Sequence, residues 1–283
     1  AMPLLIPGVV VCLLFYYFPL LYMFTVKYGG YYLSATYTIK PIKVGSILYY
    51  RGAFNSNQDQ YKEKEWFPVL TFLIEGNGHK IMVDTGCGNP AMGSMKRCFH
   101  GPSEQLPDQV PDAALRKLGV DPSEIDTVIL THLHWDHSYN NQMFPNAQFY
   151  VQRKEMLYAI SPAAKFNITY EAPVNGVVPH WLVPGVKWNI IDGDLQLFEG
   201  IRLVTLPGHS PGLQGVLVDT TDGQYLLPSD AIPLYDNFED GTFRLSGLCA
   251  NLDDFYTSFD KMKALGAKII PSHDARVAEV SQF

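Results

Sequence analysis

Four side chains that commonly bind metal ions stand within six consecutive positions of this chain. They are His132, His134, Asp136 and His137, and they directly follow the apolar run Val128-Ile129-Leu130. In an extended segment, residues two apart point to the same side, so His132 and His134 can converge on one ion. Asp136 and His137 follow where the chain turns and can face a second ion beside the first. Imidazole and carboxylate ligands suit zinc and its first-row neighbours.

A site with two metals needs more ligands than one loop supplies, and three other segments offer them. His209, Asp230 and His273 each end or directly follow an apolar run that is typical of a β-strand. Layered α/β folds commonly build their sites at this end of the strands. Three further histidines have no ligand-type partner at a useful spacing: His79, His100 and His180.

This pattern resembles the metallo-β-lactamase superfamily of dinuclear hydrolases. The resemblance rests on the motif His132-x-His134-x-Asp136-His137, followed by His209, Asp230 and His273. Asp84, in Asp84-Thr85-Gly86, matches the early Asp-Thr-Gly turn of that superfamily. The resemblance gives Asp84 the role of orienting the ligand loop through hydrogen bonds. The implied fold is α/β, a four-layer αββα sandwich of two mixed β-sheets with the metals at one edge.

The resemblance also implies a role for each ligand residue. His132, His134 and His209 would hold the first metal, Asp136, His137 and His273 the second, and Asp230 would bridge the two. Two divalent ions about 3.5–4 Å apart share a water and lower its pKa, so that a hydroxide can attack an ester carbonyl. Asp136 is also placed to pass a proton to the leaving oxygen. The expected ions are zinc, with cobalt, manganese or iron as alternatives.

Within the superfamily, the chain is similar to the N-acyl-homoserine lactonases, which open the lactone ring of bacterial quorum-sensing signals. The similarity lies in residues 149–155 and 190–194, and in Asp230-Ala231 with Asn237-Phe238 downstream. The expected reaction is therefore hydrolysis of a lactone, with an N-acyl-homoserine lactone as the first candidate substrate.

The region after Asp230 departs from the lactonase pattern. The lactonases carry a tyrosine three residues after the bridging aspartate, and this chain has Pro233 there. Tyr235 is the candidate to supply the missing hydroxyl, with a packing role as the equal alternative. Leu213 and Trp135 also stand where that branch often has other residues. A lactone other than an acyl-homoserine lactone therefore stays open.

The same metal centre serves other hydrolases. A thioesterase of the glyoxalase II type shares the ligand set, although it normally adds a C-terminal glutathione-binding region. An organophosphate triester hydrolase would direct the same hydroxide at phosphorus. A β-lactamase is disfavoured, because that activity usually goes with a site lacking a bridging aspartate. A non-catalytic ligand sensor would be marked by the loss of a ligand residue, and none is lost.

The composition fits one globular hydrolase domain, predicted over residues 31–283. The formal net charge is −7 and no Lys/Arg cluster occurs. This argues against a nucleic-acid partner, because phosphate binding needs a basic surface. The expected partner is a small lactone with an apolar tail. The cysteines show no CxxC spacing, and free buried thiols are favoured over a pairing of Cys87 with Cys98.

Residues 1–30 are predicted to be a separate apolar segment, because no charged residue occurs from Ala1 to Val26. Its length would allow a membrane span, although Pro7, Gly8 and Pro19 interrupt it. A membrane anchor, an arm that lines the pocket or forms a homodimer interface, and a signal peptide all stay open. Because these alternatives imply different locations, the protein could be cytoplasmic, membrane-associated or exported.

Local patterns place several other elements. Residues 37–48 are expected to form an extended pair of strands, with Asn77-Gly78 as a hairpin turn further on. A helix over 111–118 should end at Gly119, and an amphipathic helix over 252–265 should end at Gly266. Two predicted loops, 161–188 and 235–249, carry aromatic residues that suit an apolar substrate tail and internal packing equally: Phe166, Tyr170, Trp181, Phe238 and Phe243.

Overall fold

The computed structural model of the protein describes residues 36–62, 64–88, 102–173, 176 and 178–283. The predictions for residues 1–30 therefore lie outside the described residues, whether for a membrane anchor, a homodimer interface or a signal peptide. So does Cys98, whereas Cys87 is a buried free thiol. Within the described ranges, no helix is long and apolar enough to cross a membrane.

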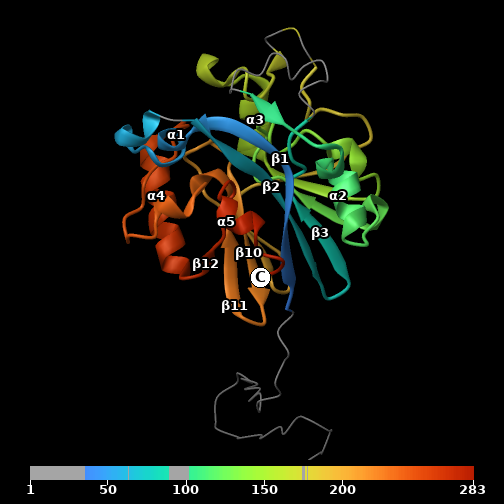
Figure 1. Ribbon diagram of the computed structural model, residues 1–283. Helices are drawn as coiled ribbons and strands as arrows, with labels where there is room; N and C mark the ends of the chain where they lie inside the picture. The colour runs from blue at the N-terminus through green and yellow to red at the C-terminus, as the bar shows by residue number, and fades with distance from the viewer. Residues whose placement is uncertain (1–35, 63, 89–101, 174–175, 177) are drawn as a thin grey trace, which may run out of the picture. The chain divides into compact units, whose positions relative to one another are not determined.

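Two mixed β-sheets form the centre of the domain (Figure 1). In the described part of the chain, the larger sheet has seven strands in the order β4-β1-β2-β3-β5-β6-β7. It is antiparallel from β4 to β3 and parallel from β3 to β7. The bounds of its strands are β1 Thr38–Tyr50, β2 Lys64–Gly76, β3 His79–Val83, β4 Ser103–Glu104, β5 Thr127–Ile129, β6 Gln148–Gln152 and β7 Lys187–Ile191.

The smaller sheet, over the same described residues, has five strands in the order β12-β11-β10-β9-β8. All of its pairs are antiparallel except the parallel pair of β11 with β12. The bounds of its strands are β8 Leu195–Phe198, β9 Ile201–Thr205, β10 Gln214–Thr220, β11 Gly223–Leu227 and β12 Lys268–Ile269. The helices are α1 Arg51–Asn55, α2 Pro111–Lys117, α3 Arg153–Ile160, α4 Leu252–Leu265 and α5 Ala275–Ala278.

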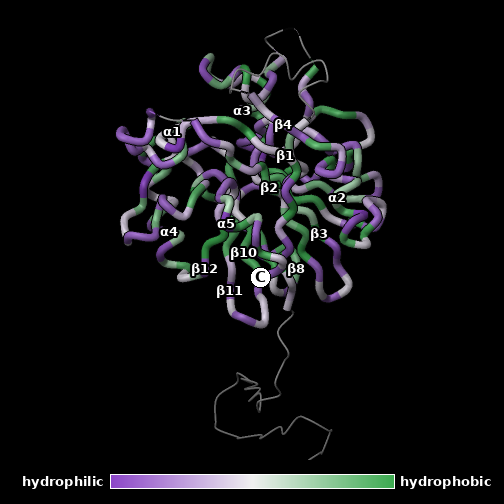
Figure 2. The backbone as a smooth tube through the Cα atoms, viewed as in Figure 1, coloured by the Kyte–Doolittle hydropathy of each residue, from purple (hydrophilic) through white to green (hydrophobic). Residues whose placement is uncertain are grey.

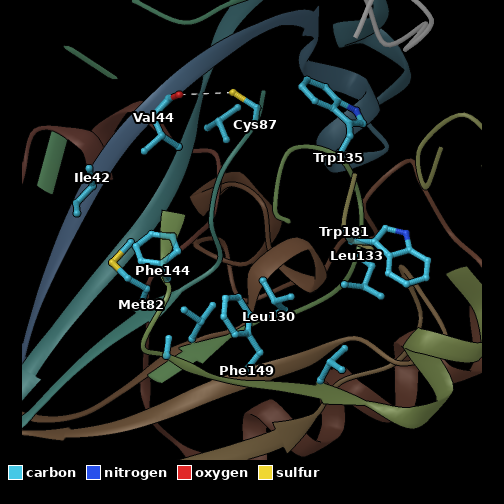
Figure 3. Packing of buried hydrophobic residues seen from close by; sticks show 14 of the residues in the cluster. Ile42, Val44, Met82, Cys87, Leu130, Leu133, Trp135, Phe144, Phe149 and Trp181 are labelled. Atoms are coloured by element: carbon cyan, nitrogen blue, oxygen red, sulfur yellow. Dashed lines mark hydrogen bonds between the residues drawn. The ribbon is translucent and has the colours of Figure 1, made fainter. Parts of the chain in front are cut away.

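Three apolar clusters separate four layers. Leu115 of α2 and Met156 of α3 pack in the cluster on the outer face of the larger sheet, which also holds Leu133, Phe149 and Trp181 (Figure 3). A second cluster joins side chains from strands of both sheets, and a third joins α4 to the smaller sheet. Figure 2 shows that the central strands are hydrophobic and the outer turns hydrophilic. The predicted αββα sandwich is therefore confirmed.

The predicted turns and helix ends are confirmed. Asn77 and Gly78 join β2 to β3 with φ of 50° and 83°, values that Asn and Gly adopt readily. The Asn251 side chain accepts a hydrogen bond from the Asp254 amide and starts α4, and Gly266 ends it with φ of 64°. These signals are local, so they can be recognised without the tertiary structure.

The predicted pair of strands over residues 37–48 is wrong. This segment forms the single long strand β1, which pairs with β2 from Thr38 to Tyr50 and is interrupted only by a register shift between Lys43 and Gly45. A side chain at Gly45 would come within 2.5 Å of the Cys87 sulfur, so the glycine marks a close approach and not a turn.

Candidate metal centre

Seven side chains predicted to bind metal come together at the ends of strands from both sheets. The loop with His132 and His137 follows β5, and His209 follows β9. Asp230 lies in the short 3-10 helix Ser229–Ala231 after β11, and His273 lies after β12. All seven are buried, with exposed fractions of 8% or less. They form three overlapping groups able to hold an ion: His132 with His134 and His209, His132 with His137 and Asp230, and Asp136 with His137 and His273.

The first group consists of three imidazoles. His134 Nδ1 lies 3.0 Å from His132 Nε2 and 3.0 Å from His209 Nε2. The three nitrogens thus converge from two separate loops. Three converging nitrogen donors could hold an ion such as zinc.

Asp230 stands between this first group and the second group, which consists of Asp136, His137 and His273. Its Oδ1 lies 3.3 Å from His137 Nε2 and 3.2 Å from His273 Nε2, and its Oδ2 lies 3.5 Å from His209 Nε2. Asp136 Oδ2 is 3.7 Å from His137 Nε2 and 3.8 Å from His273 Nε2. One carboxylate therefore faces both groups, one oxygen towards each.

Hydrogen bonds on the outer side of the imidazoles set their protonation. The Nδ1–H of His137 donates to Asp84 Oδ2 at 2.8 Å, and that of His273 donates to the Pro68 carbonyl at 2.9 Å. His209 Nδ1–H donates to the Leu248 carbonyl at 3.1 Å. With the proton on Nδ1, each Nε2 keeps a lone pair for the centre of the site.

Asp84 also holds the start of the ligand loop. Its carboxylate accepts hydrogen bonds from the Thr131 amide at 2.7 Å and the Thr131 hydroxyl at 2.8 Å. Its backbone has a φ of 63°, a left-handed conformation that aspartate tolerates better than most residues. The predicted orienting contacts of Asp84 are confirmed, and they reach His137 as well as the loop.

The charges of the site suit a cation. Burial alone would raise the pKa of Asp230, but the imidazoles of His137, His273 and His209 outweigh it and hold the pKa well below its ordinary value. Burial, with the nearby His137, lowers the pKa of His132 well below its ordinary value. Burial alone would lower the pKa of His137 and His273, but the Asp230 carboxylate outweighs it and raises both. A metal ion would bind the neutral form of these imidazoles and displace their protons.

The residues present fit a bound metal. The Nε2 atoms of His137 and His273 are buried, and neither makes a hydrogen bond of acceptable geometry with the described residues. Buried polar atoms in proteins are nearly always satisfied by a partner. An ion at the centre would satisfy both nitrogens together with the Asp230 oxygens.

A cavity opens onto the two groups. Four of the ligand residues line it: His134, Asp136, His209 and Asp230. Its other walls are mostly apolar and come from the end of β1, from α1, from the loop after β5, from the segment between α3 and β7 and from the loop before α4: Ile47, Tyr49, Ala53, Phe54, Trp135, Thr169, Ser246 and Leu248. The wall from β1 and α1 was not predicted, because nothing near Tyr49 or Phe54 in the sequence indicates a binding site.

Tyr235 does not line this cavity. The Arg276 guanidinium lies 4.5 Å above its ring, and the ring packs against the cluster between the sheets. Pro233 is buried, and its carbonyl accepts a hydrogen bond from the His273 amide. The placement of Tyr235 favours the packing alternative over a role in catalysis.

Most of the predicted aromatic residues pack inside the protein. Phe166, Tyr170 and Trp181 are buried in the cluster on the larger sheet, and Phe238 and Phe243 pack against the α4 cluster. Leu213 is buried in the α4 cluster too, whereas Trp135 does line the cavity. His180 lies 3.3 Å from Glu171 and 3.1 Å from the Ser138 hydroxyl, apart from the metal groups.

Comparison with known proteins agrees with this geometry. Residues 65–273 match the sequence profile of the metallo-beta-lactamase superfamily. The chain is 32% identical over 181 residues to an N-acyl homoserine lactonase of Bacillus cereus, which covers 61% of this chain and 67% of that protein. It is 32% identical over 222 residues to the N-acyl homoserine lactonase AttM of Rhizobium radiobacter, covering 74% and 80%.

Solved structures show the same fold. A crystal structure of a mutant of AiiA from B. thuringiensis, with N-decanoyl-L-homoserine bound at its active site, superposes with a TM-score of 0.72. The two are 25% identical, and the match covers 87% of this chain and 96% of the other. The chain therefore belongs to the metallo-β-lactamase superfamily, with N-acyl homoserine lactonases among its homologues.

Proposed function

We propose that this protein is a dinuclear metal-dependent hydrolase that opens the ester ring of a lactone, with an N-acyl-homoserine lactone as the first candidate. The observation that carries the proposal is the convergence of seven ligand-type side chains, Asp230 among them, beside a largely apolar cavity that four of them line. The similarity to N-acyl homoserine lactonases supports the choice of substrate.

The residues that would hold the ions divide into two sets. His132, His134 and His209 would hold the first ion, Asp136, His137 and His273 the second, and Asp230 would contact both. When bound, such a pair of ions supplies an activated water at neutral pH and Lewis acidity towards a carbonyl oxygen. Nitrogen donors with carboxylates favour zinc, and cobalt, manganese or iron would fit the same set.

Asp136 is the proposed proton carrier. Its carboxylate lines the cavity, so it can reach both the second ion and a bound substrate. It would take the proton of the attacking water and deliver it to the alkoxide oxygen released when the ring opens. No serine or cysteine nucleophile is needed for this step.

The cavity wall supports an ester with an apolar tail. Tyr49, Phe54 and Leu248 would contact the tail, while the hydroxyls of Thr169 and Ser246 add polar groups near the ligand residues. Apolar walls with a few placed polar groups are typical of small-molecule sites. A thioester or an organophosphate triester would use the same water, and these are the alternative substrates that the test must separate.

The test is acid release from a panel of lactones, including short and long acyl-homoserine lactones, with zinc or cobalt and with a chelator. We expect chelator-sensitive opening of at least one lactone. His134→Ala should abolish it, while His79→Gln, at a histidine in β3 outside the ion-binding groups, should leave it unchanged.

Full activity of the His134→Ala variant would exclude the proposed centre. If the chain binds two ions but opens no lactone, thioesters and phosphotriesters become the candidate substrates. A chain that binds no ions and opens no lactone would refute the proposal as a whole.

A further inference from the structure

Glu155 is a fully buried carboxylate that no step of the proposed reaction uses. It lies in the first turn of α3 and does not line the cavity. Burying a carboxylate is costly unless it is well hydrogen-bonded. The partners that satisfy Glu155 therefore indicate why this position holds an acid.

Four donors from three segments surround the Glu155 carboxylate. Oε1 accepts hydrogen bonds from the Leu133 amide at 3.0 Å and the Tyr170 hydroxyl at 2.8 Å. Oε2 accepts hydrogen bonds from the Ser210 hydroxyl at 2.7 Å and the Gly212 amide at 3.1 Å. No donor is an amide of α3 itself, so the carboxylate joins other segments and does not cap its own helix.

These partners belong to the two loops that carry the first ion-binding group. Leu133 lies between His132 and His134, and Ser210 directly follows His209. One oxygen thus holds the first loop and the other oxygen holds the second. The Tyr170 ring also packs at 4.5 Å against the His134 ring, edge to face, which adds a second contact on the first loop.

The backbone packing around Gly212 also shows that Glu155 lies where the two loops meet. A side chain at Gly212 would come within 2.1 Å of the Glu155 amide nitrogen, so the loop after His209 lies directly against α3. The spacing of the two loops is therefore set at Glu155. The second group has a different support, because Asp84 holds His137 directly.

We infer that Glu155 is a positioning residue for the first metal: it keeps the His132–His134 loop and the His209 loop at the spacing at which their three nitrogens can share one ion. The inference rests on the proposed function, since it assumes that this group binds metal. Its specific content is selectivity. Loss of the Glu155 carboxylate weakens the first site and spares the second.

Glu155→Gln tests the inference with little change of shape. A glutamine offers one oxygen and one NH2 group, so only one of the two donor pairs keeps its acceptor. Metal-free protein is titrated with Zn²⁺ against a chromophoric chelator, which resolves the two binding steps. We expect the affinity of one site to fall about 10- to 100-fold and that of the other to stay unchanged. Co²⁺ absorption spectra then show whether the affected site is the one with three histidines.

The control is Glu199→Gln, which makes the same change at an exposed position and should leave both affinities unchanged. The inference would be overturned if both sites of the Glu155→Gln variant bound Zn²⁺ as tightly as those of the wild-type protein. It would also be overturned if both sites lost affinity equally. Wild-type protein that does not bind two ions would instead overturn the proposed function, so the two failures can be told apart.

Tyr170→Phe provides a milder second variant in case Glu155→Gln does not fold. It removes one of the four donors and keeps the ring against His134. We expect a loss of about tenfold at the site with three histidines, because one hydrogen bond to a charged group is removed. Unchanged Zn²⁺ affinity in this variant would also overturn the inference.

Discussion

Replacing Asp84 by asparagine is the most informative single change at the second ion-binding group. Asp84 is 4% exposed, and its Oδ2 accepts hydrogen bonds from His137 Nδ1–H and from the Thr131 hydroxyl, both at 2.8 Å. Its Oδ1 accepts one from the Thr131 amide at 2.7 Å. Asparagine tolerates the left-handed φ of 63°, so the change removes one acceptor and the charge without straining the backbone.

The asparagine has two orientations, and each has a cost. If its oxygen faces the Thr131 amide, its NH2 faces His137 Nδ1. His137 must then carry its proton on Nε2, the atom that lies 3.3 Å from Asp230 and would bind the second ion. If the amide is turned round, its NH2 meets the Thr131 N–H, and an unsatisfied buried donor costs about 1–3 kcal/mol of folding free energy.

The expected magnitude follows from these two orientations. Replacing a group that orients a metal ligand typically lowers metal affinity about 10- to 100-fold, or roughly 1.4–2.8 kcal/mol. We expect Asp84→Asn to lose that amount at the second site in the same Zn²⁺ competition titration. Asp126→Asn is the matched control, because Asp126 also accepts a backbone amide and lies near a histidine, but at the surface. Two Zn²⁺ bound with wild-type affinity in Asp84→Asn would refute the assignment of His137 to a metal.

Three further outcomes can be checked on the folded protein. Gly212→Ala should lower the free energy of unfolding by about 1–3 kcal/mol, because the added methyl group would lie 2.1 Å from the Glu155 nitrogen; an unchanged urea midpoint would contradict this. Chelator should lower the Tm by about 10 °C or more, since two sites, each at a hundredfold excess of ion over Kd, add about 5 kcal/mol; equal melting with and without Zn²⁺ would contradict it. Burial alone would raise the pKa of Asp274, but the Arg276 guanidinium and the Tyr235 amide hold it below its ordinary 3.8. Because the folded-state pKa is lowered, the Asp274 contribution to stability is present above about pH 4 and lost below it. Asp274→Asn should therefore cost about 1–2 kcal/mol at pH 7 in denaturant unfolding and progressively less between pH 4 and pH 2.

The candidate metal ligands were visible in the sequence because their signal is local. His132 and His134 alternate in an extended segment, and His209, Asp230 and His273 each stand where an apolar run ends. The end of α4 was equally clear, since Gly266 acts on the last turn of the helix. Such features depend on neighbouring residues only, so they can be read before the fold is known.

The supporting contacts could not be predicted in this way. Glu155 is 22 residues from Leu133 and 57 from Gly212, and nothing in its own segment indicates that its carboxylate joins their loops. The cavity wall from Tyr49 and Phe54 likewise depends on where β1 ends relative to the ligand loops.

The role of Tyr235 also could not be predicted from the sequence. Its position in the sequence, close to Asp230, left a role at the site and a packing role equal, but the backbone path after Pro233 places its ring beneath Arg276. The sequence by itself determined which residues can bind metal, and its resemblance to a known superfamily indicated the layered architecture that gathers them. Only the tertiary structure decided which buried acids hold the loops of these residues and which aromatic residues line the cavity, because those contacts join segments far apart in the chain.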